Sequence, residues 1–261
     1  MDLQLQGQHV LVTGGSRGIG LACAREFLRE GCRVTLVGRD AARMEQARAA
    51  LGGSKAVAGL CADLTDAAAA LRVVDAAESG HGPVDVLVNS AGAAKRTPFA
   101  ELEPQAWHDA MQSKFFTYVH VMDPVVRRMG ARGRGAIVNV IGMGGKVATP
   151  THLPGGAANA ALMLASAGLA AAWGPRGVRV NAVNPTLTLT DRLAEGLAAD
   201  ARLRNSTPEE VRQQAEKKMP LGRLATPEEV AALVVFLASP RASYVSGAVV
   251  SVDGANSPMV V

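Results

Sequence analysis

A glycine-rich segment near the start of the chain has the residue types and spacing of a phosphate-binding turn. Thr13-Gly-Gly-Ser-Arg-Gly-Ile-Gly20 follows a short apolar run and precedes a helical pattern. Gly14, Gly18 and Gly20 allow a tight turn and a close approach of the backbone to a pyrophosphate. The helix that follows offers free N–H groups and the positive end of its dipole. Because the spacing is Gly-x-x-x-Gly-x-Gly, a turn without a ligand remains the alternative.

Seven short, β-branched segments alternate with longer helical segments, and they predict the elements that hold this turn. The strand candidates are residues 9–14, 33–38, 55–63, 84–89, 135–141, 178–183 and 248–254. Nearly continuous apolar strands are typical of a parallel sheet that is covered on both faces. We therefore predict an α/β fold, a doubly wound, seven-stranded parallel sheet with helices on both faces. No long linker or repeat interrupts the series, so one domain is expected over residues 1–261.

The composition excludes several classes of protein. The chain has 261 residues, of which 48% are hydrophobic and 19% charged, with a formal net charge of +4. This apolar content excludes a disordered chain or a coiled coil, and the length suffices for a sizeable core. The net charge is a mild bias and the arginines are scattered, so no nucleic-acid partner is expected.

The N-terminus and the cysteines indicate a cytoplasmic protein. No basic segment with an apolar run and a cleavage site opens the chain, so no signal peptide is predicted. The longest apolar stretch, residues 155–173, is mostly alanine and is interrupted by Asn159 and Ser166, so no membrane span is expected. Three cysteines without a Cys-x-x-Cys pair are typical of small buried residues in a reducing compartment, and no metal site is expected.

Further motifs, in a fixed order along the chain, resemble those of the short-chain dehydrogenase/reductase family. After the glycine-rich turn come Asp63-Leu64, Asn89-Ser-Ala-Gly92, Arg179-Val-Asn-Ala-Val-Asn-Pro185, and the C-terminal segments 220–239 and 244–254. The usual Pro-Gly of the fourth motif is Pro185-Thr186 here. The resemblance implies a Rossmann-type NAD(P)-binding domain. In it, residues 1–95 form mainly the cofactor half and residues 96–261 the substrate and oligomer half, with a lid at about 187–219.

The resemblance also implies the residues that hold a nicotinamide dinucleotide. These are Gly14, Ser16, Arg17, Gly18, Ile19, Gly20, Arg39, Asp63, Leu64, Asn89, Ala91, Gly92, Pro185 and Thr190. NAD binders usually place an acidic residue at the end of the second strand, where this chain has Gly38-Arg39. Two guanidiniums, on Arg17 and Arg39, favour the 2′-phosphate of NADP, so we predict NADP(H) rather than NAD(H). Asp40 is expected to cap the next helix, and two solvated surface arginines are the alternative.

Family members that this chain resembles use an Asn, a Ser, a Tyr and a Lys for catalysis. The Tyr is the acid or base, the Lys lowers its pKa, the Ser positions the carbonyl and the Asn supports a proton relay. Counting from the flanking motifs places Lys114, Gly142, Gly155 and Asn159 at these four positions. Tyrosine occurs only at 118 and 244, and the chain contains no Tyr-x-x-x-Lys.

Loss of these side chains affects turnover more than cofactor binding. Hydride transfer to a carbonyl leaves an alkoxide that must be stabilised and protonated, so ordinary carbonyl or alcohol turnover is expected to be very weak or atypical. Each missing hydrogen bond to the cofactor costs about 1 kcal/mol, so binding is expected to be weakened and not lost.

Two residues are candidates for a replacement role. His152, three residues before Gly155, is a weak candidate for a substitute acid or base, and an exposed loop histidine is the alternative. Lys114 either replaces the charge that is missing at Asn159 or extends to solvent. Gly142, Gly144, Gly145, Gly155 and Gly156 crowd the expected site, which indicates either an enlarged pocket or a flexible site.

Two helical patterns complete the prediction. A spacing of three to four residues predicts one buried helix face at Trp107, Met111, Phe115, Val119 and Met122. The alanine-rich segment 157–173 resembles the helix through which family members contact one another. The resemblance therefore implies a homotetramer or a dimer.

Three functions remain open from the sequence. The first is an NADP(H)-linked oxidoreductase of atypical mechanism that acts on an unknown small molecule. The second is a non-catalytic cofactor-binding sensor, or an inactive subunit that assembles with an active relative. The third is a lyase or isomerase built on the same fold.

Overall fold

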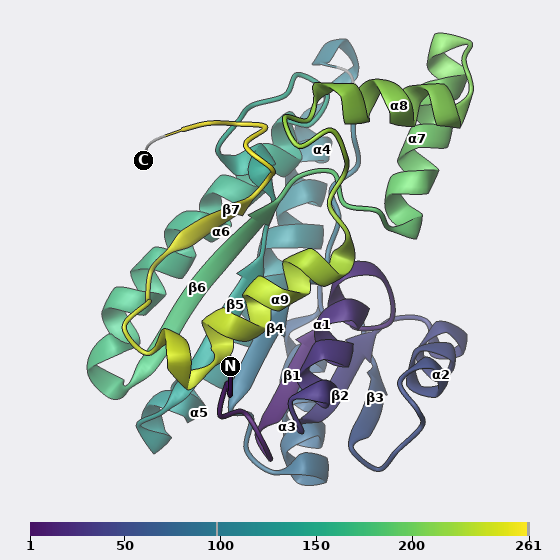
Figure 1. Ribbon diagram of the computed structural model, residues 1–261. Coiled ribbons are helices and arrows are strands. Elements are labelled where there is room, and N and C mark those ends of the chain that lie inside the picture. Colours follow the sequence, from purple (N-terminus) through teal and green to yellow (C-terminus); the bar gives the residue numbers. More distant parts are fainter. Residues whose placement is uncertain (98, 260–261) are drawn as a thin grey trace.

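A computed structural model describes residues 1–97 and 99–259, except the side chains at 195–196, 199–200 and 202–204. The seven predicted strands form one parallel sheet in the order β3-β2-β1-β4-β5-β6-β7, which confirms the predicted fold (Figure 1). The strands are β1 His9–Thr13, β2 Arg33–Gly38, β3 Val57–Cys61, β4 Val86–Asn89, β5 Gly135–Val140, β6 Val178–Pro185 and β7 Val249–Val252.

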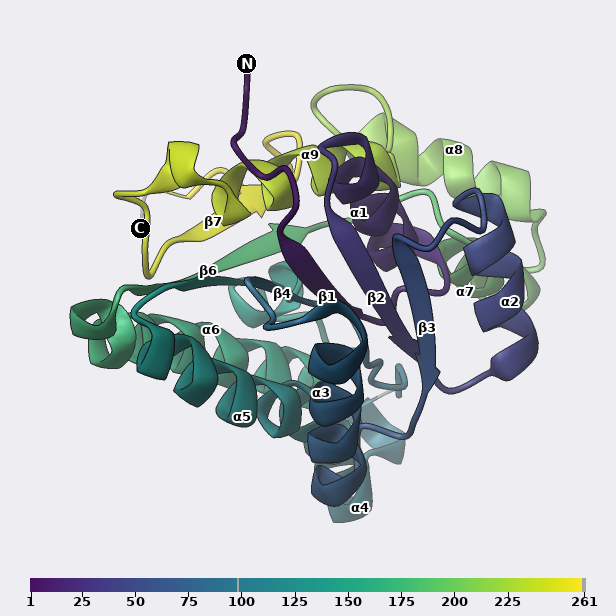
Figure 2. The same ribbon diagram turned by 90° about the horizontal axis from the view of Figure 1, so that it is seen from below.

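Helices cover both faces of this sheet. They are α1 Gly18–Arg29, α2 Ala41–Ala50, α3 Ala67–His81, α4 Pro104–Ala110, α5 Thr117–Arg132, α6 Leu153–Trp173, α7 Asp191–Arg204, α8 Pro208–Lys218 and α9 Pro227–Ala238. Figure 2 shows α1, α2 and α9 on one face and α3, α5 and α6 on the other. Capping boxes at Thr207 and Thr226 begin α8 and α9, as their Thr-Pro-Glu-Glu sequences suggest.

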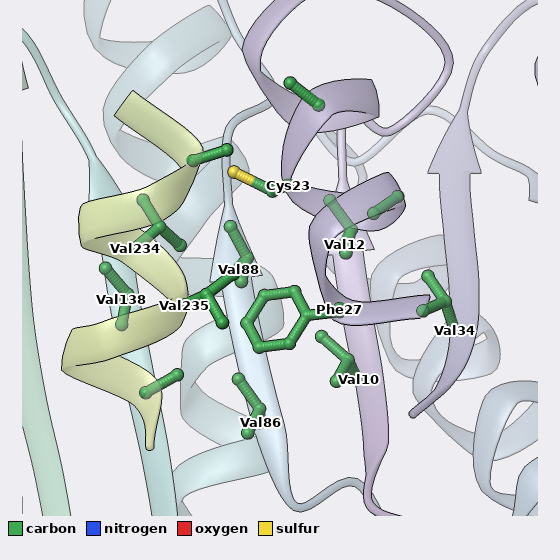
Figure 3. Close-up of a cluster of buried hydrophobic side chains, with 14 of the residues drawn as sticks. Val10, Val12, Cys23, Phe27, Val34, Val86, Val88, Val138, Val234 and Val235 are labelled. Atoms are coloured by element: carbon green, nitrogen blue, oxygen red, sulfur yellow. The ribbon is translucent and has the colours of Figure 1, made fainter. Parts of the chain in front are cut away.

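Strand alternation divides the core into two layers. Val10 and Val12 of β1 pack under α1 and α9, whereas Leu11 between them packs on the side of α3 and α5. Successive strand residues point to opposite faces, so a parallel strand that is covered on both sides must be apolar at every position. In the first layer, Phe27 of α1 lies between the strand valines and Val235 of α9 (Figure 3).

A chain of buried polar side chains crosses the carboxyl ends of β1, β4 and β5. Thr13 Oγ1 donates to Asn89 Oδ1 at 3.2 Å, and Asn89 Nδ2 donates to Asn139 Oδ1 at 3.0 Å. Asn139 Nδ2 then donates to Ser166 Oγ of α6 at 2.9 Å. All four residues are buried, so each of these bonds replaces contacts with water and fixes three strands and one helix at the same level.

A π-helical turn, η2 Met111–Phe116, joins α4 to α5 and changes the predicted buried face. Met122 is buried as expected, but Trp107 is 41% exposed, so the predicted continuous face is wrong at its start. A π turn inserts one residue relative to an α-helix and rotates the side chains before it by about 100°. The 3.6-residue period therefore does not hold across Lys114.

Residues 153–176 form one stretch that is long and apolar enough to cross a membrane by length and composition alone, which is weak evidence for a span. Ala158, Leu162 and Ser166 of this helix are buried, and Leu162 packs in the second core layer. The exposed side of α6 carries small residues together with Leu164, which is 77% exposed.

Replacing Asn139 by Leu tests the polar chain. The substitution leaves the buried Asn89 Nδ2 without its acceptor, so we expect Asn139→Leu to lower the free energy of unfolding by about 2–3 kcal/mol. Ile137→Val, on the same strand and the same face, is the control and should cost about 1 kcal/mol. Urea unfolding of the two variants decides the matter. If both variants lose the same free energy of unfolding, the buried polar side chains add nothing to stability beyond packing.

Candidate functional site

A cleft of about 720 Å³ lies at the carboxyl end of the sheet. Eleven predicted cofactor residues line it: Gly14, Ser16, Arg17, Gly18, Ile19, Arg39, Asp63, Leu64, Ala91, Gly92 and Thr190. In an open parallel sheet, ligands bind outside the carboxyl ends of the strands, where the strand order reverses. Here this point lies between β1 and β4, so the topology places the cleft where the glycine-rich turn begins.

The glycines shape this cleft in different ways. Gly14 has φ +67°, and a Cβ there would stand 2.8 Å from the Ala91 nitrogen in the loop after β4. A Cβ on Gly20 would overlap the Gly14 carbonyl, so Gly20 allows α1 to pack on the turn without itself lining the cleft. Gly18 has φ +54° and lies against Thr190. Each glycine is thus explained by backbone geometry or by close packing.

The N-terminus of α1 opens into the cleft and fits an anion. Its N-cap Arg17 has extended backbone and makes no side-chain cap, and no acidic residue occupies the first helical turn. The first N–H groups of a helix lack partners within the helix, and the dipole places positive charge there. These features match the pyrophosphate of a dinucleotide.

Two predicted cofactor residues lie behind the cleft. Asn89 is fully buried and belongs to the polar chain with Thr13 and Asn139, so it holds the loop in place. Pro185, at the end of β6, presents its carbonyl 3.8 Å from the position of a Cβ on Gly142.

Three arginines and two carboxylates surround the end of the cleft near β2 and β3. Arg17, Arg39 and Arg43 all line it. Asp40 caps α2 as predicted, because its Oδ1 accepts from the Arg43 nitrogen at 3.0 Å. Hydrogen bonds from the Thr65 nitrogen and hydroxyl lower the pKa of Asp63. Sequence reasoning missed Arg43, although its position three residues after a helix cap is the signal that could have found it.

Lys114 and Asn159 both reach the end of β5, and neither lines the cleft. The π turn η2 directs Lys114 inward, where Nζ donates to the Ile141 carbonyl at 2.9 Å. Asn159 of α6 donates from Nδ2 to the next carbonyl, that of Gly142, at 3.4 Å. The two side chains therefore donate hydrogen bonds to consecutive backbone carbonyls at the end of β5. Burial, with a smaller effect of the Arg192 charge, lowers the pKa of Lys114 to about 8.

The imidazole of His152 occupies the space that a side chain at Gly155 would need. His152 is the N-cap residue of α6, and a Cβ on Gly155 would overlap its ring at Cε1. Burial, followed by the charges of Arg96, Lys114 and Arg192, lowers the pKa of His152 to about 4. Its Nδ1 is buried without a hydrogen-bond partner, as is Oδ1 of Asn159. His152 is thus half-buried and faces the site, and is not an exposed loop residue.

The other glycines do not enlarge a pocket. A Cβ on Gly145 would meet Met163 Cε at 2.6 Å, and one on Gly156 would meet the Gly144 carbonyl at 2.7 Å. Of the two alternatives that the sequence left open, the geometry does not favour an enlarged pocket at Gly145, Gly155 and Gly156, because neighbouring groups fill the space. Gly142 has more room, with its nearest contact at 3.6 Å, but its φ of +120° strains any other residue.

Neither tyrosine reaches the Gly155 position. Tyr118 is buried and donates from its hydroxyl to the Val140 carbonyl at 2.5 Å. Burial raises its pKa, so it stays protonated. Tyr244 is fully exposed at the far end of the fold.

Arg192 links the start of α7 to the loop after β4. It lies at the start of α7 and donates from Nη1 to the Gly92 carbonyl at 3.4 Å. Sequence reasoning missed Arg192, Ser113 and Arg96, because their positions relative to the cleft depend on loop conformations.

Within the residues that the structure describes, no group of three His, Cys, Asp or Glu side chains could hold a metal ion.

Comparisons with known proteins agree with this geometry. Residues 14–255 match the family described as enoyl-(acyl carrier protein) reductase. The chain is 37% identical to D-threitol dehydrogenase of Mycolicibacterium smegmatis, over 97% of this chain and 94% of the relative. It is 36% identical to gluconate 5-dehydrogenase of Gluconobacter oxydans, over 96% and 94%. The crystal structure of L-sorbose reductase from Gluconobacter frateurii with NADPH and L-sorbose superposes with a TM-score of 0.93 at 30% identity, covering 100% of both chains.

Substituting Gly155 tests whether His152 requires a glycine there. Gly155→Ala overlaps the imidazole and also approaches Ala94 Cβ at 2.8 Å. We expect a loss of about 1–3 kcal/mol in the free energy of unfolding. Gly168→Ala on the same helix, where a Cβ meets nothing within 4 Å, should be neutral or stabilising.

The double variant His152→Ala/Gly155→Ala completes the cycle. Removing the ring should recover about 1 kcal/mol or more of the cost of Gly155→Ala. Additive costs in thermal or urea unfolding would contradict the inference that the ring fills this space.

Proposed function

This chain belongs to the short-chain dehydrogenase/reductase family, and on that basis we propose that it binds NADP(H) as an oxidoreductase-type protein whose ordinary carbonyl and alcohol turnover is very weak or atypical. The observation that carries the proposal is the juxtaposition of two sites. A cleft built for a dinucleotide adjoins a cluster in which His152 stands in the place of a side chain at Gly155.

Three observations support NADP(H) as the cofactor. The α1 N-terminus offers unpaired N–H groups to a pyrophosphate, and Arg17, Arg39 and Arg43 surround the end of the cleft where a 2′-phosphate fits. The similar L-sorbose reductase was solved with NADPH. When bound there, the cofactor would supply hydride-transfer chemistry.

The tetrad that family members use is, on this proposal, absent. Lys114, Gly142, Gly155 and Asn159 take its positions by motif counting. A positioned proton donor contributes about 10²–10⁴-fold and an oxyanion donor about 10²–10³-fold, although these factors need not multiply. Ordinary turnover should therefore fall by several orders of magnitude, whereas cofactor affinity is weakened less.

The remaining side chains divide the proton chemistry between them. With its pKa lowered to about 4, His152 is neutral at pH 7, so it can donate a hydrogen bond to a ligand but is not a source of protons. Lys114, with a pKa of about 8, is an ammonium at neutral pH and can release a proton to a developing alkoxide. The unpartnered Oδ1 of Asn159 is available to accept from a hydroxyl of substrate or ribose.

A non-catalytic sensor or an inactive subunit paired with an active relative is the second candidate. It is favoured by the filling of the site, since His152 and Met163 take the volume that the glycines leave. The exposed Leu164 and small residues of α6 support assembly as a homotetramer or dimer, or with such a relative. Under either candidate function, we propose a cytoplasmic location and a lid formed by residues at about 187–219. No observation within the described residues favours a lyase or isomerase.

Calorimetric titration of both cofactors tests the cofactor assignment. We expect NADPH to bind at least about tenfold more tightly than NADH, because guanidiniums pair with the 2′-phosphate. Arg39→Gln should reduce NADPH affinity by about tenfold and leave NADH affinity unchanged. Arg29→Gln, whose side chain pairs with Glu26 outside the cleft, is the matched control. Equal affinities in the unmodified protein, or tighter NADH, would sink the assignment.

The pH dependence of carbonyl reduction tests the role of Lys114. Because the ammonium form is the donor and its pKa is lowered from 10.5 to about 8, reduction should be fastest below pH 8 and decline as pH rises through it. Lys114→Met should remove this decline and lower the rate at pH 7 by about 10²-fold. The rate is followed by the loss of NADPH absorbance over a panel of ketones. A decline that persists in Lys114→Met would assign it to another group, and no turnover at any pH would favour the sensor.

A further inference from the structure

We propose that the site beside the dinucleotide cleft selects a substrate that carries an acidic group, a carboxylate in the simplest case, and that Lys114 and Arg96 supply its counter-charge. The inference rests on the proposed function in so far as it names the substrate class of that same site. The charge distribution around His152 and the partners of Lys114 carry it.

Lys114 has no counter-ion among the described residues. The acceptor that the structure gives it is the neutral Ile141 carbonyl, which engages one of three N–H donors. Among the residues that the structure describes, no carboxylate forms an ion pair with it. Burial of a charge is costly unless the charge is paired, so the arrangement favours an anion from outside the chain.

His152 reports a positive field in the same place. The charges of Arg96, Lys114 and Arg192 all lower its pKa, and they come from three segments: the loop after β4, the π turn and the start of α7. Among the described side chains, no carboxylate contributes in the opposite direction. Asp191 also lines the cleft, yet it affects the pKa of neither His152 nor Lys114.

The start of α6 adds to this field. His152 is the N-cap of this helix but makes no side-chain cap, and no acidic residue lies in the first turn. The positive end of the helix dipole is therefore uncompensated within the helix. Among the described residues, His152 Nδ1 is also buried without a partner, so it can donate to a ligand. The loop that carries Arg96 lies beside this helix start, because the Thr97 nitrogen donates to the Thr151 carbonyl at 3.1 Å. The helix end, the unpaired ring nitrogen and the Arg96 loop therefore lie together.

Anion binding at this point has a consequence that can be measured. A carboxylate offsets the cations that lower the pKa of His152, so it raises that pKa from about 4 toward its ordinary value. Binding near pH 6 must then take up protons from solution, by linkage. A neutral ligand of the same shape does not have this effect.

Matched acids and esters test the proposal in the presence of NADP⁺, which prevents reduction during the titration. The pairs are pyruvate and methyl pyruvate, acetoacetate and methyl acetoacetate, and levulinate and methyl levulinate, which vary the distance between carbonyl and charge. We expect at least one acid to bind about tenfold or more tightly than its ester. Calorimetry at pH 6 in two buffers of different ionisation enthalpy should show proton uptake for that acid alone.

Three variants locate the effect. Lys114→Met and Arg96→Gln should each reduce the acid-to-ester preference by about fivefold or more, and Lys114→Arg should retain most of it. Lys95→Gln is the matched control, because Lys95 is the exposed neighbour of Arg96 and does not affect the pKa of His152. Circular dichroism of each variant establishes that it is folded.

The outcomes separate this proposal from the proposed function. Equal binding of acid and ester in all three pairs overturns the anion site, as does a preference that survives in both Lys114→Met and Arg96→Gln. Acid-selective binding without reduction by NADPH supports the anion site and contradicts the oxidoreductase function. If NADPH reduces the esters as fast as the acids, the oxidoreductase function is supported and the anion site is contradicted.

Discussion

The hydrogen-bonded chain from Thr13 through Asn89 and Asn139 to Ser166 is the constraint on which the rest of the structure depends. It joins β1, β4 and β5 to α6 at the level where the strands end. Two sites lie next to this hydrogen-bonded chain. The cleft lies on the side of β1, and Lys114, His152 and Asn159 lie on the side of β5 and α6. Because these four hydrogen-bonded side chains are buried, a shift of any one strand would leave polar groups unpaired. The position of one site relative to the other is therefore fixed.

The side chains around Gly155 fit together closely. Gly155 is small where the His152 ring lies, and Asn159 and Lys114 bind the neighbouring carbonyls of Gly142 and Ile141. The space around Gly155 and Gly145 is therefore occupied by neighbouring groups. Burial is the main cause that lowers the pKa of both Lys114 and His152 in this part of the structure.

Prediction from sequence succeeded where the determining contacts are local. Seven short β-branched segments located all seven strands, and at Thr207 and Thr226 the local Thr-Pro-Glu-Glu sequence suffices for a capping box. It failed at Trp107, because the π turn around Lys114 breaks a period that assumes a regular helix. It also left open whether the glycines near Gly155 enlarge the pocket or make the site flexible, since the sequence does not show which neighbour fills the space.

The sequence by itself determined the parallel α/β sheet, the glycine-rich turn and the absence of any Tyr-x-x-x-Lys segment, because composition, periodicity and adjacent residues suffice for each. Only the tertiary structure decided that the Lys114 amine reaches the end of β5, that the His152 ring fills the space beside Gly155, and that the loop carrying Arg96 lies against the segment before His152. Those facts depend on contacts between segments far apart in the chain, and such distances follow from packing and not from spacing along the sequence.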